Sequence, residues 1–201
     1  MRLPLIVAGL LTLPLMACNP AAAPKPSAPG APAETADAQA PAARAPVGAV
    51  AHASLVNGTG EAAGTATFRQ GPTGVLIRIE ATGLTPGWHG LHLHGVGQCA
   101  GPKFTSAGAH VKHDGSTAVH GLLNAEGPES GDLPNLYAGA DGRGFAEVFT
   151  SDAALVDGAN GANLLDADGA AILIHAMADD HAAQPIGGSG DRVACGVITA
   201  G

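Results

Sequence analysis

The chain has 201 residues, a formal net charge of −8 and only nine lysines and arginines, scattered along the sequence. This length fits one ordinary domain with additional segments, and the absence of a basic stripe argues against nucleic acid as a partner.

The first 17 residues have the pattern of a removable signal. Arg2 is the only early charge, and the apolar run that follows is too short to span a bilayer comfortably. The run ends in LMAC, which resembles the lipobox of bacterial lipoproteins. We expect cleavage before Cys18 and a lipid on this cysteine that anchors the protein to a membrane of the cell envelope, facing the periplasm. Asn19 favours the outer membrane, and an ordinary secretory signal with an incidental cysteine is the alternative.

Residues 18–46 contain the lipid-bearing cysteine and then little besides alanine, proline and a few polar residues. They show no apolar periodicity, and proline disfavours both helix and sheet, so we interpret them as a flexible tether. The folded domain is predicted to cover residues 47–201, which is long enough to bury a sizeable core.

Short runs with apolar alternation, bounded by glycine, asparagine or proline, predict an all-β domain. No segment shows a sustained helical period, and an antiparallel sandwich or barrel is the natural interpretation. Between Gly95 and Gly144 there is almost no strand pattern, and so long a loop in a compact domain is usually functional. The predicted strands are AVAHASLV, GTATFRQ, GVLIRIEA, WHGLHLHG, GFAEVFT, AILIHAM and VACGVIT.

Cys99 and Cys195 remain in the predicted domain. An exported protein meets an oxidising compartment, which favours a disulfide between them. Such a bond would close a long loop and contribute roughly 4–5 kcal/mol at most. Two free thiols acting as soft metal ligands are the alternative.

Histidines are placed where they could bind a metal ion. On a strand, His92 and His94 would point to the same face, about 6–7 Å apart at the backbone. His175 lies in a second apolar strand, where a buried imidazole needs a partner, and His110 follows a turn of small residues. Four histidines on separate elements suit a tetragonal nitrogen site of the kind copper(II) favours. A structural or exposed pair is the competing interpretation of the HLH motif.

Several motifs occur in the order found in copper/zinc superoxide dismutases, and residues 47–201 resemble this family throughout. The resemblance implies an eight-stranded Greek-key β-barrel, an immunoglobulin-like sandwich, with a metal site on its outer face. It also implies superoxide as the substrate. The motifs are GWHGLHLHGVGQC, SAGAH, HG, GDLPNL, DADG, IHAMADDH and GGSGDRVACGVI.

The resemblance also implies roles for individual residues. His110 matches an imidazole that bridges copper and zinc, and Arg192 matches an arginine that guides the anion to copper. Asp179 matches a carboxylate that links a copper histidine to a zinc histidine, and His89 matches a structural histidine. The implied copper ligands are His92, His94, His110 and His175, and the implied disulfide joins Cys99 to Cys195.

The implied reaction is the dismutation of superoxide to dioxygen and hydrogen peroxide by a redox-cycling copper. The bridging imidazole can accept a proton and give it up again, and zinc tunes its basicity. An acidic protein repels superoxide, so a local positive charge such as that of Arg192 is needed near copper.

The zinc site departs from the family pattern. His110, His120 and Asp132 match three zinc ligands, but the position of a third histidine holds Glu129. Glu129 could bind zinc through a carboxylate oxygen, or His113 could swing in. If neither binds, the stretch is a polar loop.

Two rival functions differ at particular residues. A copper-binding or storage protein on the same barrel could lose Arg192 or a copper ligand, whereas this chain keeps them. A copper-only dismutase would differ only at the zinc position, at Glu129 and His113. The sequence leaves the oligomeric state open.

Overall fold

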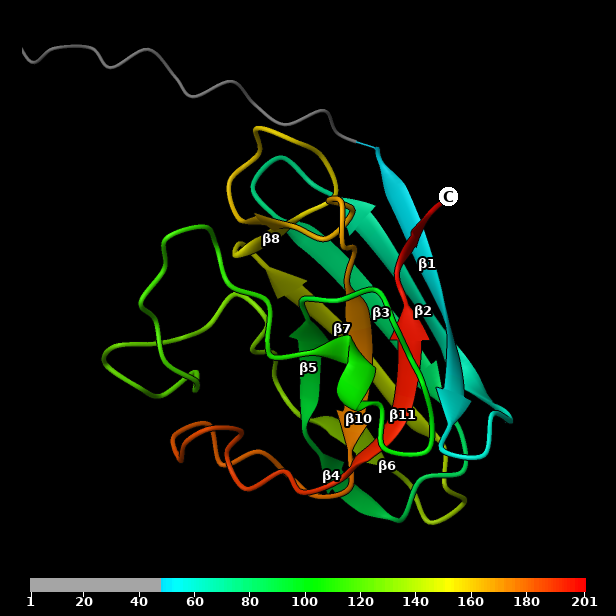
Figure 1. The fold of residues 1–201 in the computed structure, drawn as a ribbon. Coiled ribbons are helices and arrows are strands. Elements are labelled where there is room, and N and C mark those ends of the chain that lie inside the picture. The colour runs from blue at the N-terminus through cyan, green and yellow to red at the C-terminus, as the bar shows by residue number, and fades with distance from the viewer. Residues whose placement is uncertain (1–47) are drawn as a thin grey trace, which may run out of the picture. The chain divides into compact units, whose positions relative to one another are not determined.

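A computed structural model describes residues 48–201 (Figure 1). The predicted signal at residues 1–17, the lipidated Cys18 and the tether to residue 46 lie outside the described residues, so they stay predictions. Within the part of the chain that is described, no helix is long and apolar enough to cross a membrane.

The domain is built on one large antiparallel sheet that almost closes into a barrel, as predicted (Figure 1). A separate pair of two-residue parallel strands, β8 (Ala153–Ala154) and β9 (Ala162–Asn163), lies beside it. The strands of the large sheet are β1 (Val50–Asn57), β2 (Ala62–Gln70), β3 (Val75–Ala81), β4 (Gly87–His89), β5 (Leu91–His94), β6 (Leu136–Ala138), β7 (Gly144–Thr150), β10 (Ala171–His175), β11 (Arg192–Val197) and β12 (Thr199–Ala200).

Closure depends on one bent strand. β4 and β5 lie at opposite ends of the strand order β4-β6-β7-β3-β2-β1-β11-β10-β5, but Gly90 alone separates them in the chain. A Cβ atom at Gly90 would lie 2.5 Å from the Ser189 hydroxyl oxygen, so only glycine fits at the bend. If β4–β5 and β11–β12 each count as one strand, the barrel has the eight predicted strands. β3 pairs with β7 and β1 with β11, and these long crossings give the Greek-key connection.

Apolar and polar residues alternate along the strands, and the apolar side chains form the core. In β3, Val75, Ile77 and Ile79 are fully buried, whereas Arg78 and Glu80 face solvent. The strands predicted from such runs are all present. β6 was not predicted because it has only three residues, although its buried-exposed-buried pattern repeats the same alternation.

β5 and β10 differ because every residue in them is buried. Their inner faces, with Leu91 and Leu93 on β5 and Ile172 and Ile174 on β10, join the main core. Their outer faces are covered by the long segment between β5 and β6 and by the segment between β10 and β11, which project from the same side of the domain (Figure 1). The polar side chains on the outer faces of β5 and β10 are therefore buried between the barrel and these two covering segments.

A disulfide holds the first of these segments against the sheet, as predicted. Cys99 is joined to Cys195 of β11, 96 residues further along the chain, with 5.7 Å between their Cα atoms. Cys195 is fully buried and belongs to a small second core with Phe104 and Leu173. The 3-10 helix η1 (Thr105–Ala107) follows Phe104 within the segment that the disulfide anchors.

Candidate metal centre

Three histidines come together on the outer faces of β5 and β10. His92 and His94 alternate with Leu91 and Leu93, so they point away from the main core as predicted. In the β5–β10 register, Leu173 lies opposite His92, and His175 follows two residues later on the same face. All three imidazoles are buried, and their ligand nitrogens lie within 4.8 Å of one another.

Each imidazole of this three-histidine group has one ring nitrogen against an oxygen acceptor and one without a partner. The engaged pairs are His92 Nε2 with Asp179 Oδ2 at 2.8 Å, His94 Nδ1 with the Gly108 carbonyl at 2.9 Å, and His175 Nδ1 with the Gly190 carbonyl at 3.1 Å. Because the engaged nitrogen carries the proton, the other nitrogen presents a bare lone pair. The unpartnered atoms are His92 Nδ1, His94 Nε2 and His175 Nε2.

Burial keeps these imidazoles neutral. It lowers the pKa of His94 to about 2 and that of His175 to about 3, and it also lowers the pKa of His92. A neutral imidazole is the form that binds a metal ion. Three buried lone pairs without donors are costly in a packed protein unless a cation accepts them, so the arrangement fits a metal ion of the copper type.

His110 lies between the three-histidine group and a second cluster. Its ring centroid lies 4.3 Å from that of His92 and 4.9 Å from that of His94. Nε2 has no partner, and Nδ1 lies 2.8 Å from a Glu129 oxygen and 3.1 Å from an Asp132 oxygen without hydrogen-bond geometry. One imidazole ring thus faces nitrogen ligands on one side and carboxylates on the other.

Asp132 is the centre of the second cluster. One carboxylate oxygen lies 2.7 Å from His120 Nδ1, and the other accepts the N–H groups of Gly121 and Glu129 at 2.8 and 2.9 Å. Burial alone would raise the pKa of Asp132, but contact with His110, the Gly121 N–H and the charge of His120 lower it to about 2. The carboxylate is therefore ionised and fixed in direction.

Glu129 and His113, the two candidates for the fourth zinc ligand, lie in different places. Glu129 is buried, with Oε2 at 2.8 Å from His110 Nδ1. His113 is exposed, and its Nδ1 lies 3.2 Å from the neighbouring Asp114 carbonyl. The structure thus brings Glu129, and not His113, to His110. We call His110, His120, Glu129 and Asp132 the mixed site.

The donor set of the mixed site fits zinc. Its contacts between imidazole nitrogens and carboxylate oxygens are 2.7–3.1 Å long. Four ligands at 2.0–2.2 Å around a tetrahedral zinc ion would lie about 3.4 Å apart, so the contacts among His110, His120 and Asp132 could open slightly to admit one. Glu129 is not among the side chains whose ligand atoms all lie within 4.8 Å of one another, so it would have to turn towards the ion. The ligand atoms of His92, His110, His120 and Asp132 also all lie within 4.8 Å of one another, so the two clusters adjoin.

Asp179 connects the clusters, as the resemblance implies. Its Oδ2 accepts from His92 at 2.8 Å and its Oδ1 lies 3.1 Å from His120 Nε2. Burial alone would raise its pKa, but the His92 hydrogen bond and the His181 N–H hold that pKa well below its usual range. Asn135, to which the sequence alone assigns no role, exchanges two hydrogen bonds with the Asp179 backbone, at 2.8 and 2.9 Å.

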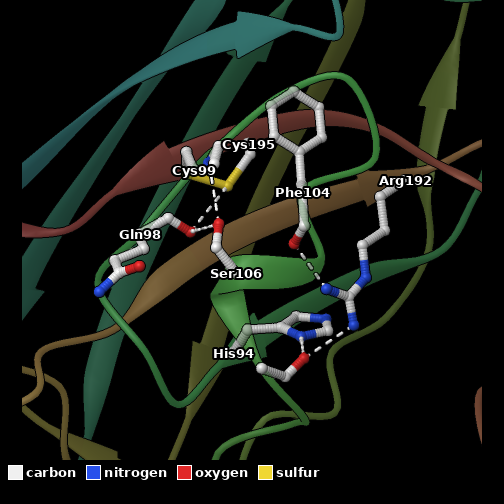
Figure 2. Close-up of a disulfide and its surroundings, with 9 residues drawn as sticks. His94, Gln98, Cys99, Phe104, Ser106, Arg192 and Cys195 are labelled. Atoms are coloured by element: carbon white, nitrogen blue, oxygen red, sulfur yellow. Dashed lines mark hydrogen bonds between the residues drawn. A yellow bond between two sulfur atoms is a disulfide. The ribbon is translucent and has the colours of Figure 1, made fainter.

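Arg192 lies at the edge of the three-histidine group. Its Nη1 donates to the Phe104 carbonyl and its Nη2 to the Gly108 carbonyl, both at 2.7 Å. Figure 2 shows that His94 and Arg192 reach the same carbonyl oxygen, that of Gly108. Burial lowers the pKa of Arg192, but a guanidinium stays charged at any physiological pH.

The remaining histidines have other contacts. His89 is buried, and its ring nitrogens lie 2.7 Å from the His175 carbonyl and 2.8 Å from the Thr85 carbonyl. These contacts suit the structural role predicted for this histidine. His52 is exposed on β1. His181 lies beside Asp179 and Asn135, at 3.4 and 3.2 Å.

The fold and the two clusters define a β-barrel protein with two adjoining groups of possible metal ligands. Residues 62–198 match the family model for copper/zinc superoxide dismutase (SODC). The chain therefore belongs to the copper/zinc superoxide dismutase family, which uses copper and zinc.

Individual relatives agree with this assignment. A Cu-Zn superoxide dismutase of Caulobacter vibrioides is 53% identical over 141 residues, covering 70% of this chain and 80% of that protein. Cu-Zn superoxide dismutase 2 of Aquifex aeolicus is 40% identical over 149 residues, covering 74% and 85%. A solved structure of a SOD-like protein from Bacillus subtilis has a TM-score of 0.68 and 39% identity, covering 72% of this chain and 95% of that one.

Proposed function

We propose that this chain is a superoxide dismutase with copper at the three-histidine group and His110, and with zinc at the mixed site. The observation that carries the proposal is the convergence of unpartnered nitrogens from His92, His94, His175 and His110 in a buried layer. Neutral imidazoles are good copper ligands, and both copper oxidation states accept them.

Copper, when bound, exchanges one electron with each of two superoxide anions, so that the first leaves as dioxygen and the second becomes hydrogen peroxide with two protons. Arg192 binds and orients the anion. Its guanidinium has five N–H donors, and two of them are used by the Phe104 and Gly108 carbonyls, so three remain for superoxide. Its fixed charge offsets the repulsion between the acidic protein and the anion.

His110 is the residue that holds and releases a proton, at Nε2. That nitrogen has no hydrogen-bond partner among the described residues, and the His110 ring centroid lies 4.3 Å from that of His92. Nδ1 faces Glu129 and Asp132 and would bind zinc, which lowers the basicity of the ring. Asp179 holds His92 and His120 in the orientations that both sites require.

Metal analysis together with kinetics tests the proposal. Purified protein should contain about one copper and one zinc per chain and should accelerate the decay of superoxide followed by its absorbance. His175→Ala should lose most of its copper and its dismutation. His52→Ala, a matched change of an exposed histidine on β1, should keep both. Protein that retains copper but leaves superoxide decay at the uncatalysed rate would instead favour a copper-storage function.

The lipid anchor is a second part of the proposal. It is supported by the LMAC motif that ends at Cys18 and by the alanine- and proline-rich residues that follow. We propose a periplasm-facing protein attached to a membrane, with the outer membrane favoured by Asn19. Mass spectrometry of membrane-extracted protein should find a diacylglyceryl group on Cys18. Cys18→Ser should release the protein from membranes, and a variant that stays membrane-bound would rule out this anchor.

A further inference from the structure

The two oxygens of Glu129 have different partners. Oε2 points to His110 Nδ1 at 2.8 Å, and Oε1 lies 2.8 Å from the Lys112 ammonium. The Glu129 side chain is only 11% exposed. Each oxygen thus has a single close partner, one inside the mixed site and one outside it.

Lys112 is itself held in place. Its ammonium donates to the Ala118 carbonyl at 2.9 Å as well as to Glu129. It follows His110 by two residues, so the segment that brings the shared imidazole to both sites also carries the lysine. Its side chain is 41% exposed, with the ammonium on the outer side of a buried carboxylate.

The charges explain why a cation is needed there. Asp132 and Glu129 bring two carboxylates to one buried imidazole, and Asp179 adds a third next to His120. A divalent ion neutralises two negative charges, and a further buried carboxylate is costly unless it is paired. Lys112 is the ammonium group that contacts these carboxylates in the described part of the chain.

Geometry gives Lys112 a second effect. An ammonium on Oε1 leaves Oε2 as the oxygen directed at the metal, so Glu129 would bind through one oxygen. One-oxygen binding preserves the four-ligand geometry that zinc prefers. Without the lysine, both oxygens of Glu129 could turn to the ion.

We propose that Lys112 is a positioning residue of the zinc site, which holds Glu129 as a one-oxygen ligand and neutralises its charge. This inference rests on the proposed function, which assigns zinc to the mixed site. An exposed lysine–glutamate pair contributes little by itself. This pair differs because its carboxylate is buried and its other oxygen faces the site, so its effect should appear in metal binding.

A double-mutant cycle isolates that effect. Lys112→Met removes the charge and keeps much of the side-chain length, and Lys112→Arg keeps the charge. Glu129→His replaces the carboxylate with a neutral ligand that has nothing for Lys112 to neutralise. Zinc affinity is measured in all combinations, with the copper-loaded, disulfide-bonded protein, by competition against a chromophoric chelator. Lys103→Met, at an exposed lysine, controls for the loss of one positive charge.

We expect Lys112→Met to weaken zinc binding about tenfold, the lower end of the range for residues that orient metal ligands. Lys112→Arg and Lys103→Met should stay within about twofold of wild type. With Glu129→His already present, Lys112→Met should have less than about a twofold effect. The cobalt-substituted protein gives an independent readout. Lys112→Met should weaken its visible absorption bands, because an additional carboxylate oxygen raises the coordination number.

The possible failures are distinguishable. The inference is wrong if Lys112→Met leaves zinc affinity unchanged. It is also wrong if Lys112→Met weakens zinc binding equally in the wild-type and Glu129→His backgrounds. In both cases the assignment of zinc to the mixed site still stands. If wild-type protein binds copper but no zinc, the zinc part of the proposed function fails and the inference fails with it. Unfolding temperatures of every variant show whether a loss of zinc comes from a loss of fold.

Discussion

At the scale of single residues, Arg192 is fixed by two carbonyls and keeps donors free for an anion. We expect Arg192→Ala to lower the rate constant for superoxide at least about tenfold and to flatten its dependence on ionic strength. Electrostatic steering by a charge is screened over roughly 8–10 Å at ordinary salt, so its removal should reduce the salt slope. Copper content should stay near one per chain.

Arg192→Lys is the matched variant, because it keeps the charge but cannot serve both carbonyls and the anion with one planar group. It should retain the salt slope and lose part of the rate. Stopped-flow measurements over a range of salt concentrations distinguish the two effects. A salt slope in Arg192→Ala equal to that of wild type would rule out steering by this residue.

The mixed site allows a second residue-scale prediction. Glu129 touches His110, whereas His113 is exposed, so Glu129→Ala should lower zinc occupancy and His113→Ala should not. The expected loss in zinc affinity is about tenfold or more, because one of four ligands disappears. Zinc per chain, measured after dialysis against a weak chelator, gives the result. Equal zinc loss in both variants would contradict the assignment of Glu129.

At the scale of elements, the turn that carries Glu129 and Asp132 is threaded between β5 and the segment after His110. Gly131 accepts the N–H of Leu93 at 2.8 Å and donates to the Val111 carbonyl at 2.9 Å. A Cβ atom at this glycine would lie 2.2 Å from the Leu93 carbonyl oxygen. The close approach of the Gly131 backbone to β5 therefore fixes the position of the turn, and with it the positions of the Glu129 and Asp132 carboxylates.

Gly131→Ala should push this turn away from β5. We expect a loss of about 2–4 kcal/mol in the free energy of unfolding, in the range of overpacking a dense interior, together with a loss of zinc. Gly115→Ala is the control in the same loop: its Cβ would have open space, but its φ of 73° makes alanine strained by about 1 kcal/mol. Urea unfolding and zinc content test both. Similar results for the two variants would contradict the threading argument.

Elements with several alternating residues could be predicted from the sequence, and the shortest ones could not. β3, β5 and β10 follow directly from the strand-like runs GVLIRIEA, WHGLHLHG and AILIHAM. β6 and the β8–β9 pair have two or three residues each, too few for a period to be read. Their pairing depends on partners far away in the chain, which local propensity does not describe.

The candidate site divides in the same way. The positions of His92, His94 and His175 could be predicted because each lies on a strand with a defined face. The choice between Glu129 and His113 could not, because both lie in the loop after β5, whose path depends on the Gly131 contact and on the disulfide. Lys112 gave no sequence signal, since its importance depends on an oxygen 17 residues away.

At the scale of the whole molecule, the buried histidines connect the site to the stability of the fold. In the metal-free protein the pKa of His94 is lowered to about 2 and that of His175 to about 3, mainly by burial. In the unfolded chain both titrate near 6.5. Their contribution to stability is therefore present above pH 6.5 and lost as the pH falls, because the unfolded chain binds protons that the folded protein excludes.

Other groups with shifted pKa values modify this profile, and two of them show the two possible signs. Asp132, whose pKa is about 2, contributes stability above its unfolded pKa near 4 that is lost as the pH falls further. His120 acts in the opposite direction. Burial alone would lower its pKa, but the neighbouring carboxylates of Asp132 and Asp179 raise it. Its contribution to stability is therefore present below pH 6.5 and is lost as the pH rises through the pKa of the folded state. Between pH 6 and 4 the destabilisation by the buried, neutral histidines should dominate.

We therefore expect the free energy of unfolding of metal-free, disulfide-bonded protein to fall by about 2–3 kcal/mol per pH unit between pH 6 and 4, since each excluded proton contributes about 1.4 kcal/mol per unit. Urea unfolding at several pH values measures the slope. His94→Leu should reduce it by about one proton, even if the protein is less stable overall, whereas His52→Ala should leave it unchanged. Metal-loaded protein should resist acid to a lower pH, because bound ions compete with protons for the same nitrogens. A metal-free protein equally stable at pH 6 and pH 4 would contradict the burial of neutral histidines on which the copper site depends.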